Sequence, residues 1–340
     1  MSDLNVDRCE LPEVDEKFKS LDQGKRSIFS LKTLHGFDFS EASSSLQKAI
    51  RRGHWKDALQ WAVEMFHVPI QGKSNLFNRL YTISVEDVGI ADPKQFYDVN
   101  ELHKLYLEDK DNPIYAVTAA VSLAKAMKTR ASDWSCHVFR HSQSDVKNYD
   151  PEKLINGLVK NFFDNKKGEI LRYTSMLMGT SEEVKMKGIR YTIPIKIAIT
   201  LIRKKIELTS DKQNYMNDVL DRAIDKIKSP SKNMKKPCRG GEGLLFFIYF
   251  ANLHTFHVEY GYNDEVTADK TLLPLIEDVK NGEILGVPDY ALDKHTRRGK
   301  KMRRGLKHFI EVSSKLNNED PKWVKYSSFC LEKCKERMGV

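Results

Sequence analysis

The residues best suited to chemistry lie in the segment Asp289–His308, which reads DYALDKHTRRGKKMRRGLKH. It holds few acids and many cations, which are Lys294, Arg297, Arg298, Lys300, Lys301, Arg303, Arg304 and Lys307. Each lysine or arginine that neutralises a phosphate releases a condensed counterion, so such clusters bind nucleic acid strongly and without regard to sequence. Gly299 and Gly305 would let the backbone approach phosphate oxygens, which accept hydrogen bonds from backbone N–H groups. The segment therefore predicts a contact site for a nucleic-acid backbone.

The pattern D-x-H-T-x-x-G inside this segment is more particular than a run of charges. Asp293, His295 and Thr296 form a compact polar trio, and His295 and Thr296 are included in the predicted nucleic-acid contact. One alternative is a solvated basic face or a nuclear-localisation-like patch. Another is a nuclease-like enzyme, in which Asp293 orients His295 as an acid or base near neutral pH. Residues two apart point the same way only on a strand or an extended loop.

A second basic stretch, SPSKNMKKPCRGGEG, runs from Ser229 to Gly243. Its proline, glycine and serine content is typical of a loop. Lys235, Lys236 and Arg239 are candidate phosphate contacts there, with a solvated linker as the alternative. The stretch also suggests a division of the chain into a polar N-terminal arm, a helical domain, a basic loop and a C-terminal helical region, over residues 1–43, 44–230, 231–243 and 244–340.

Helices must position these groups, and the clearest helical pattern lies between Leu46 and Pro93. Apolar residues at helical spacing predict a helix over Trp55–Phe66, namely Trp55, Ala58, Leu59, Ala62, Val63 and Phe66. Gly53 suits a tight link from a preceding helix. Ser74 and Asn75 are good N-cap residues and predict a helix that begins there. Further helices are expected over residues 94–108, 113–128, 151–162, 168–178, 193–208, 210–228, 264–280, 300–316 and 321–337, with 130–148 less regular.

Two motifs in this stretch carry a family resemblance: L-x-K-x-I-R-R-G-x-x-x-x-A-x-x-W-A and R-L-x-x-I-x-x-E-D-V-G-x-A-D-P. Their residues are Leu46, Lys48, Ile50, Arg51, Arg52, Gly53, Ala58, Trp61 and Ala62, then Arg79, Leu80, Ile83, Glu86, Asp87, Val88, Gly89, Ala91, Asp92 and Pro93. Over residues 44–130 the chain resembles the helical collar domain of the MgsA/RarA/Werner-interacting group of clamp-loader-like AAA+ ATPases. The resemblance implies a mostly α, multi-helical bundle that drives oligomerisation or docking beside DNA at stalled forks.

The motor of that family has no counterpart in this sequence. A P-loop places a glycine-rich turn that ends in Gly-Lys-Ser/Thr between a strand and a helix. The nearest candidate, His67–Ser74, ends in Gly-Lys-Ser, but His67 replaces the first glycine and the segment follows a helix. We therefore expect no nucleotide or other cofactor. The expected function is a non-catalytic accessory factor in DNA replication or repair rather than an enzyme.

Glu86 and Asp87 suggest paired carboxylates for acid–base or Mg²⁺ chemistry. Adjacent residues on a helix point about 100° apart, so these two side chains do not converge by themselves. We expect a structural ion-pair network instead, with Arg51, Arg52 and Arg79 as the basic partners.

Three further clusters have spacings that metal ligands use: His254 with His257, Cys136 with His137 and His141, and Cys330 with Cys334. None has the paired CxxC spacing of a convincing zinc site, so we expect core histidines, buried free cysteines and no metal. The apolar run Leu244–Val258 is shorter than the roughly 20 residues of a membrane span. It predicts a buried helix or a pair of strands.

Composition sets the broader bounds. The 340 residues carry a formal net charge of +9, which favours a polyanionic partner. We expect DNA, with RNA as the alternative, a second copy of the chain or a replication protein as protein partner, and no membrane. Five scattered cysteines and a polar N-terminus without signal-peptide character predict an intracellular protein, cytoplasmic or nuclear. The remaining alternative is a structural oligomerisation protein that binds no nucleic acid and uses its charge for solubility.

Overall fold

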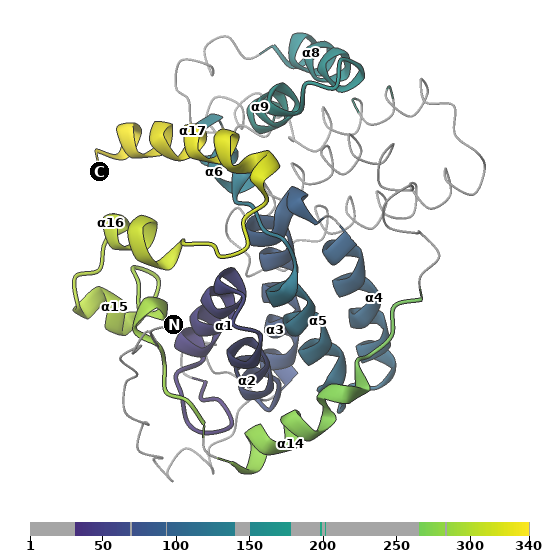
Figure 1. The fold of residues 1–340 in the computed structure, drawn as a ribbon, viewed down its shortest axis with the longest axis vertical. Helices are drawn as coiled ribbons and strands as arrows, with labels where there is room; N and C mark the ends of the chain where they lie inside the picture. The colour runs from purple at the N-terminus through teal and green to yellow at the C-terminus, as the bar shows by residue number, and fades with distance from the viewer. Residues whose placement is uncertain are drawn as a thin grey trace.

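A computed structural model of the chain describes residues 31–68, 70–92, 94–139, 150–177, 198, 201, 265–282 and 284–339. These residues form a mostly α, multi-helical fold, as the sequence predicts (Figure 1). Several predictions lie outside the described residues: the arm up to residue 30, the helices over residues 193–208 and 210–228 apart from residues 198 and 201, the basic loop with Lys235, Lys236 and Arg239, the apolar run with His254 and His257, and His141.

A helical hairpin begins the described chain, with α1 over Phe39–Arg52 and α2 over Trp55–Phe66. The predicted bounds of the second helix are confirmed. Asp38 caps α1 because its carboxylate accepts a hydrogen bond from the backbone N–H of Ser40. Gly53 links the two helices at φ 71°, a left-handed conformation that glycine adopts without strain.

Helix α2 lies at the centre of the fold and is buried on nearly all sides. It packs against α1 and α5, and its Trp61 and Met65 are fully buried. Gln60 lies off the predicted apolar stripe, yet it is buried as well. Its amide pairs with the backbone of Leu285, donating to the carbonyl at 2.8 Å and accepting from the N–H at 3.0 Å. A later segment of the chain therefore covers the face that the sequence pattern left polar.

The next helix, α3, spans Ile70–Ile83. The prediction that it begins at Ser74 and Asn75 is wrong, because those residues lie inside the helix. Gly72 lets the first turn pack against Val68, since an added Cβ would lie 2.5 Å from the Val68 Cβ. The Gly-Lys-Ser sequence is thus helical and does not form the turn of a P-loop.

A π-helical turn, η3 (Ser84–Val88), and a 3-10 turn, η4 (Gly89–Ala91), follow α3. Gly89 has φ 57°, and an added Cβ would lie 3.0 Å from the Thr129 carbonyl oxygen. Both the backbone conformation and the close approach therefore call for glycine. The turn carries Glu86 and Asp87 towards α1 and the residues around Arg130.

The middle of the chain supplies α4 (Lys94–Glu108), α5 (Ile114–Lys125), α6 (Ala131–Phe139), α8 (Pro151–Phe163) and α9 (Lys167–Leu177). Helix α6 occupies residues that the sequence pattern left irregular. Helix α5 ends before Lys128, where the prediction placed its end, because Lys128 joins a parallel bridge with Glu319. The Lys128 N–H donates to the Asn318 carbonyl at 3.0 Å, which replaces a helical bond.

The C-terminal part consists of η5 (Lys270–Leu272), α14 (Leu273–Asn281), η6 (Asp289–Ala291), α15 (Arg297–Lys301), α16 (Leu306–His308), η7 (Phe309–Ser313) and α17 (Pro321–Met338). The prediction of α17 is confirmed, and Asp320 caps it by accepting from the Lys322 N–H. The predicted single helix over 300–316 is wrong. Arg303 has φ 54°, and the backbone bends there between α15 and α16.

One hydrophobic core joins the two ends of the described chain. It runs from Leu31 and Phe37 through α1, α2 and α5 to Tyr290 and Trp323. A smaller cluster holds Trp134, Val138, Phe309, Ile310, Cys330 and Cys334 where α17 crosses α6 (Figure 1). Helix α14 and the turn η6 therefore pack on the N-terminal helices α2 and α1, and α17 packs on α6. Among the described helices, none combines the length and the apolar character that a membrane crossing requires.

Candidate nucleic-acid interface

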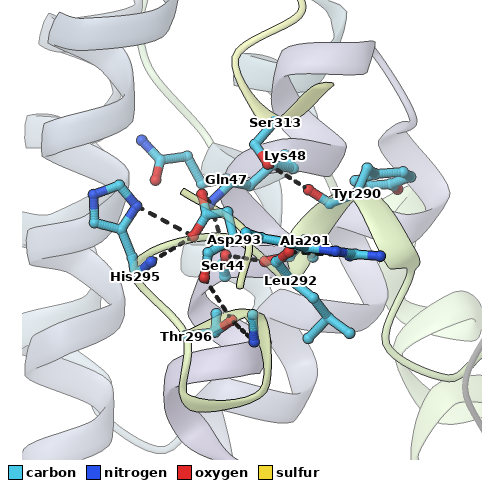
Figure 2. Close-up of polar contacts among 12 residues, drawn as sticks. Ser44, Gln47, Lys48, Tyr290, Ala291, Leu292, Asp293, His295, Thr296 and Ser313 are labelled. Carbon is cyan, nitrogen blue, oxygen red and sulfur yellow. Dashed lines mark hydrogen bonds and ion pairs between the residues drawn. The ribbon is translucent and has the colours of Figure 1, made fainter. Parts of the chain in front are cut away.

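A buried ion pair ties the basic C-terminal segment to α1 (Figure 2). The Lys48 Nζ lies 2.8 Å from Oδ2 of Asp293 and 2.7 Å from the Ser44 hydroxyl. Ser44 in turn donates to the Ala291 carbonyl at 2.6 Å. Burial lowers the pKa of Lys48 to about 8 despite the carboxylate beside it. Burial alone would raise the pKa of Asp293, but hydrogen bonds from His295 and the charge of Lys48 hold that pKa well below its usual range.

The D-x-H-T-x-x-G pattern forms a tight turn on this ion pair. The Asp293 Oδ1 accepts from the His295 N–H at 2.8 Å and lies 3.2 Å from the His295 Nδ1 (Figure 2). Thr296 caps α15 by accepting from the Gly299 N–H and donates its own proton to the Asp293 carbonyl, both at 3.1 Å. An added Cβ on Gly299 would lie 2.1 Å from that carbonyl oxygen. Each residue of the pattern thus has a structural contact in the turn.

Three of the predicted phosphate contacts are engaged by other residues of the fold. Arg298 pairs with Glu41 on α1, with Nη2 and Oε2 2.7 Å apart. Arg304 pairs with Asp289 at 2.5 Å and donates to the carbonyls of Asp289 and Leu292. Lys294 is half-buried, with Nζ 4.9 Å from the centre of the Phe309 ring. Arg298 thus holds the segment on α1, whereas the contacts of Arg304 and Lys294 stay within residues 289–309. All three cations have less charge to offer a ligand.

The remaining cations of the segment face solvent. Arg297, Lys300, Lys301 and Arg303 are exposed, and no acidic side chain of the described residues forms an ion pair with them. Lys307 is exposed too and lies 4.0 Å from Glu311 on the next helical turn. The His295 side chain is 58% exposed. Figure 1 places α15, with Arg297, Lys300 and Lys301, and α16, with Lys307, at one edge of the fold. We call Arg297, Lys300, Lys301 and Arg303 the open basic face.

An ion-pair network lies around Asp87, and of the predicted basic partners only Arg51 belongs to it among the described residues. The Oδ1 of Asp87 lies 2.7 Å from Arg51 Nε and 2.6 Å from Arg130 Nη1, and Gln47 donates to Oδ2 at 2.8 Å. Burial would raise the pKa of Asp87, but the two guanidinium charges outweigh it and lower that pKa. Arg130, which also pairs with Asp133, was missed because sequence alone shows only its local i, i+3 spacing to that acid.

The other members predicted for this network lie outside it. Arg52 donates to the Val312 carbonyl at 2.7 Å and its guanidinium stacks 4.0 Å above the Tyr290 ring. Arg79 donates to the Ser43 hydroxyl at 3.0 Å. Glu86 is half-buried and forms no ion pair with a described residue. Burial, followed by the charges of Asp133 and Asp87, raises its pKa from 4.5 to about 8.

Glu86 gives a prediction about pH. The folded chain keeps a proton on Glu86 that the unfolded chain releases above pH 4.5, so stability falls as the pH rises from about 4.5 towards about 8. Glu86→Gln mimics the protonated side chain and should remove this fall. Urea unfolding at pH 5 and pH 8.5 should show little difference at the lower pH and a gain of at least about 1 kcal/mol for the variant at the higher pH. Parallel pH profiles would contradict the assignment.

The described residues offer no metal centre: no group of three or more His, Cys, Asp or Glu side chains converges among them. Cys330 and Cys334 are buried and free, and burial raises the pKa of their thiols to about 11 and about 12. The Cys334 thiol lies 3.6 Å from the Trp134 carbonyl oxygen. His137 lies on the surface, 3.6 Å from Asp133.

The open basic face follows a turn whose backbone is fixed by the buried ion pair between Lys48 and Asp293. Its open basic face suits a phosphate backbone, whereas Asp293 is fully buried and engaged by Lys48 and His295. In comparisons with known proteins, no family model, no curated protein and no solved structure matches this chain.

Proposed function

We propose that the chain is a nucleic-acid-binding accessory factor of DNA replication or repair, without an ATPase motor of its own. The open basic face carries this proposal: its four cations are exposed, close in sequence and held on an anchored turn. The excess of positive charge over the whole chain and the collar resemblance of residues 44–130 support it. In this proposal the basic face contacts phosphates, and the α1–α2 hairpin belongs to a module for self-assembly or docking.

Phosphate contact explains the chemistry of the face better than catalysis does. Lysine and arginine on phosphate give affinity that falls steeply with salt and depends little on sequence. A hydrolytic role would rest on His295, whose Nδ1 faces Asp293 while the ring is largely exposed. That dyad has a structural use already, because the Asp293 carboxylate fixes the turn and pairs with Lys48.

The test is a salt-titrated binding assay on duplex, single-stranded and forked DNA and on RNA. Arg297→Glu with Arg303→Glu should weaken binding at least about tenfold, because two phosphate contacts are lost. For the same reason the slope of log K against the logarithm of salt concentration should become about 2 less steep. The matched control is Lys104→Glu with Lys153→Glu, which changes the net charge equally at exposed positions of α4 and α8. Arg298 and Arg304 are left intact because they pair with Glu41 and Asp289.

Other outcomes would favour the two alternatives. Equal loss in both double variants would mean that net charge alone drives binding, and unchanged affinity would contradict the proposal. Metal-dependent cleavage of labelled DNA or RNA that disappears in His295→Ala would favour a nuclease-like enzyme. A defined oligomer by light scattering, with no nucleic acid retained at low salt, would favour a structural oligomerisation protein.

A further inference from the structure

A second cationic surface lies at the link between α1 and α2, and its centre is aromatic. Trp55 is half-buried and begins α2. The Nζ of Lys56 lies over the Trp55 ring at 5.6 Å from its centre, and the Nζ of Lys125, at the end of α5, lies over the ring at 5.0 Å. Both lysines are exposed. The three side chains come from two helices and belong to neither the turn at Asp293 nor the network at Asp87.

The backbone under this surface is held in place from several directions. Gly53 fixes the bend at φ 71°. The loop before α17 covers the ends of α1 and α5: the Asn317 N–H donates to the Arg51 carbonyl at 2.9 Å, and its side-chain amide donates to the Arg52 carbonyl at 3.0 Å. The backbone at Trp55 is therefore held in place, so the protein loses less conformational entropy when a ligand binds there.

Charge around Trp55 is mainly positive. Besides Lys56 and Lys125, Lys315 is exposed at the start of the same covering loop. The nearest acid along the chain, Asp57, points inward, with Oδ2 3.5 Å from the Tyr290 hydroxyl. Glu319 is half-buried, and burial raises its pKa, which disfavours its charged form. The surface thus combines an aromatic ring with ammonium groups, and the acid nearest to Trp55 in sequence, Asp57, is buried.

We propose that Trp55 is a stacking platform for a base of single-stranded nucleic acid: the base takes the place of the two ammonium groups over the ring, and the exposed side chains of Lys56 and Lys125 move to the flanking phosphates. This inference rests on the proposed nucleic-acid function and names the strand class. Proteins that bind single strands combine aromatic rings, on which bases stack, with cations along the backbone. Bases of a duplex stack on each other, so their faces are closed to an indole ring. A single strand leaves those faces open.

The test compares labelled oligo-dT of about 20 nucleotides, a length that spans one or more single-strand sites, with a duplex of equal length. Trp55→Ala should weaken binding of oligo-dT about tenfold, because the variant loses the stacking contact with about one base. It should change duplex affinity less than about twofold, because the faces of duplex bases are closed to the ring. Trp55→Phe keeps an aromatic ring and should retain most of the affinity. Leu107→Ala on α4 is the matched control, because Leu107 is a 52% exposed apolar side chain away from both basic surfaces.

The outcomes separate this inference from the function on which it rests. If Trp55→Ala and Leu107→Ala bind oligo-dT alike while Arg297→Glu with Arg303→Glu loses binding, the stacking role is wrong and the proposed function stands. If the unaltered chain binds no nucleic acid, both fall. Should Trp55→Ala fail to fold by circular dichroism, Lys56→Glu with Lys125→Glu decides: a selective loss of oligo-dT binding supports the platform, and equal loss on duplex and single strand overturns it.

Discussion

Lys48→Met is expected to destabilise the fold by about 3–5 kcal/mol, although methionine matches the length of lysine and suits an apolar site. The variant leaves the carboxylate of Asp293 buried without its cation, and an isolated buried charge costs far more than the pair contributes. Both side chains are almost fully inaccessible, and Nζ and Oδ2 are 2.8 Å apart. Urea unfolding followed by circular dichroism measures the loss.

A double variant that removes both charges, and a control at an exposed ion pair, test whether the unpaired charge causes the loss. Lys48→Met combined with Asp293→Asn removes both charges and should recover much of the lost stability, because no unpaired ion remains. Lys104→Met is the control, since Lys104 pairs with Glu101 on the surface of α4 and such pairs contribute well below 1 kcal/mol. If the free energy of unfolding of Lys48→Met lay within about 1 kcal/mol of that of the unaltered chain, the ion pair would not anchor the turn.

Local sequence signals predict the helices whose ends are marked by residues next to them in the sequence. The apolar stripe and Gly53 fix α2 at Trp55–Phe66, and an aspartate followed by proline marks the first residues of α8 and α17. These signals act within a turn or two of helix, so they read directly from the sequence. The end of α5 was misjudged because a bridge to Glu319, far along the chain, sets it.

The candidate site was predictable in its composition and not in its geometry. The basic character of residues 294–307 is plain in the sequence, whereas the division into paired and exposed cations depends on Glu41 and Asp289. From sequence alone the D-x-H-T-x-x-G pattern predicts a ligand contact, because a buried partner for Asp293 cannot be inferred locally. Its partner, Lys48, lies near the other end of the chain. Long-range burial thus gives structural roles to residues whose types suggest chemistry.

Asp87→Ala is expected to have the largest effect of any single substitution in the described fold, a loss of more than about 4 kcal/mol. One carboxylate oxygen holds two guanidinium groups, from Arg51 at 2.7 Å and Arg130 at 2.6 Å. Arg51 and Arg130 are 2% and 3% exposed, so without Asp87 two like charges face each other in a buried site. Arg130 keeps its pair with Asp133 in the variant, whereas Asp87 is the acid with which Arg51 forms an ion pair among the described residues. Partial unfolding or insolubility at 37 °C is therefore the expected behaviour.

The pH dependence separates loss of charge from loss of packing at this site. The folded-state pKa of Asp87 is lowered, so its contribution is present above the unfolded value of 3.8 and is lost as the pH falls through the folded value. Asp87→Asn keeps the shape and removes the charge. Its stability deficit should be large at pH 7 and should shrink in acid, where the unaltered chain also loses the charge. Asp111→Asn is the control, because Asp111 is fully exposed and its pairing with Lys73 should leave the urea midpoint unchanged. A deficit of Asp87→Asn that stays constant from pH 7 into acid would mean that packing, and not the guanidinium contacts, makes Asp87 necessary.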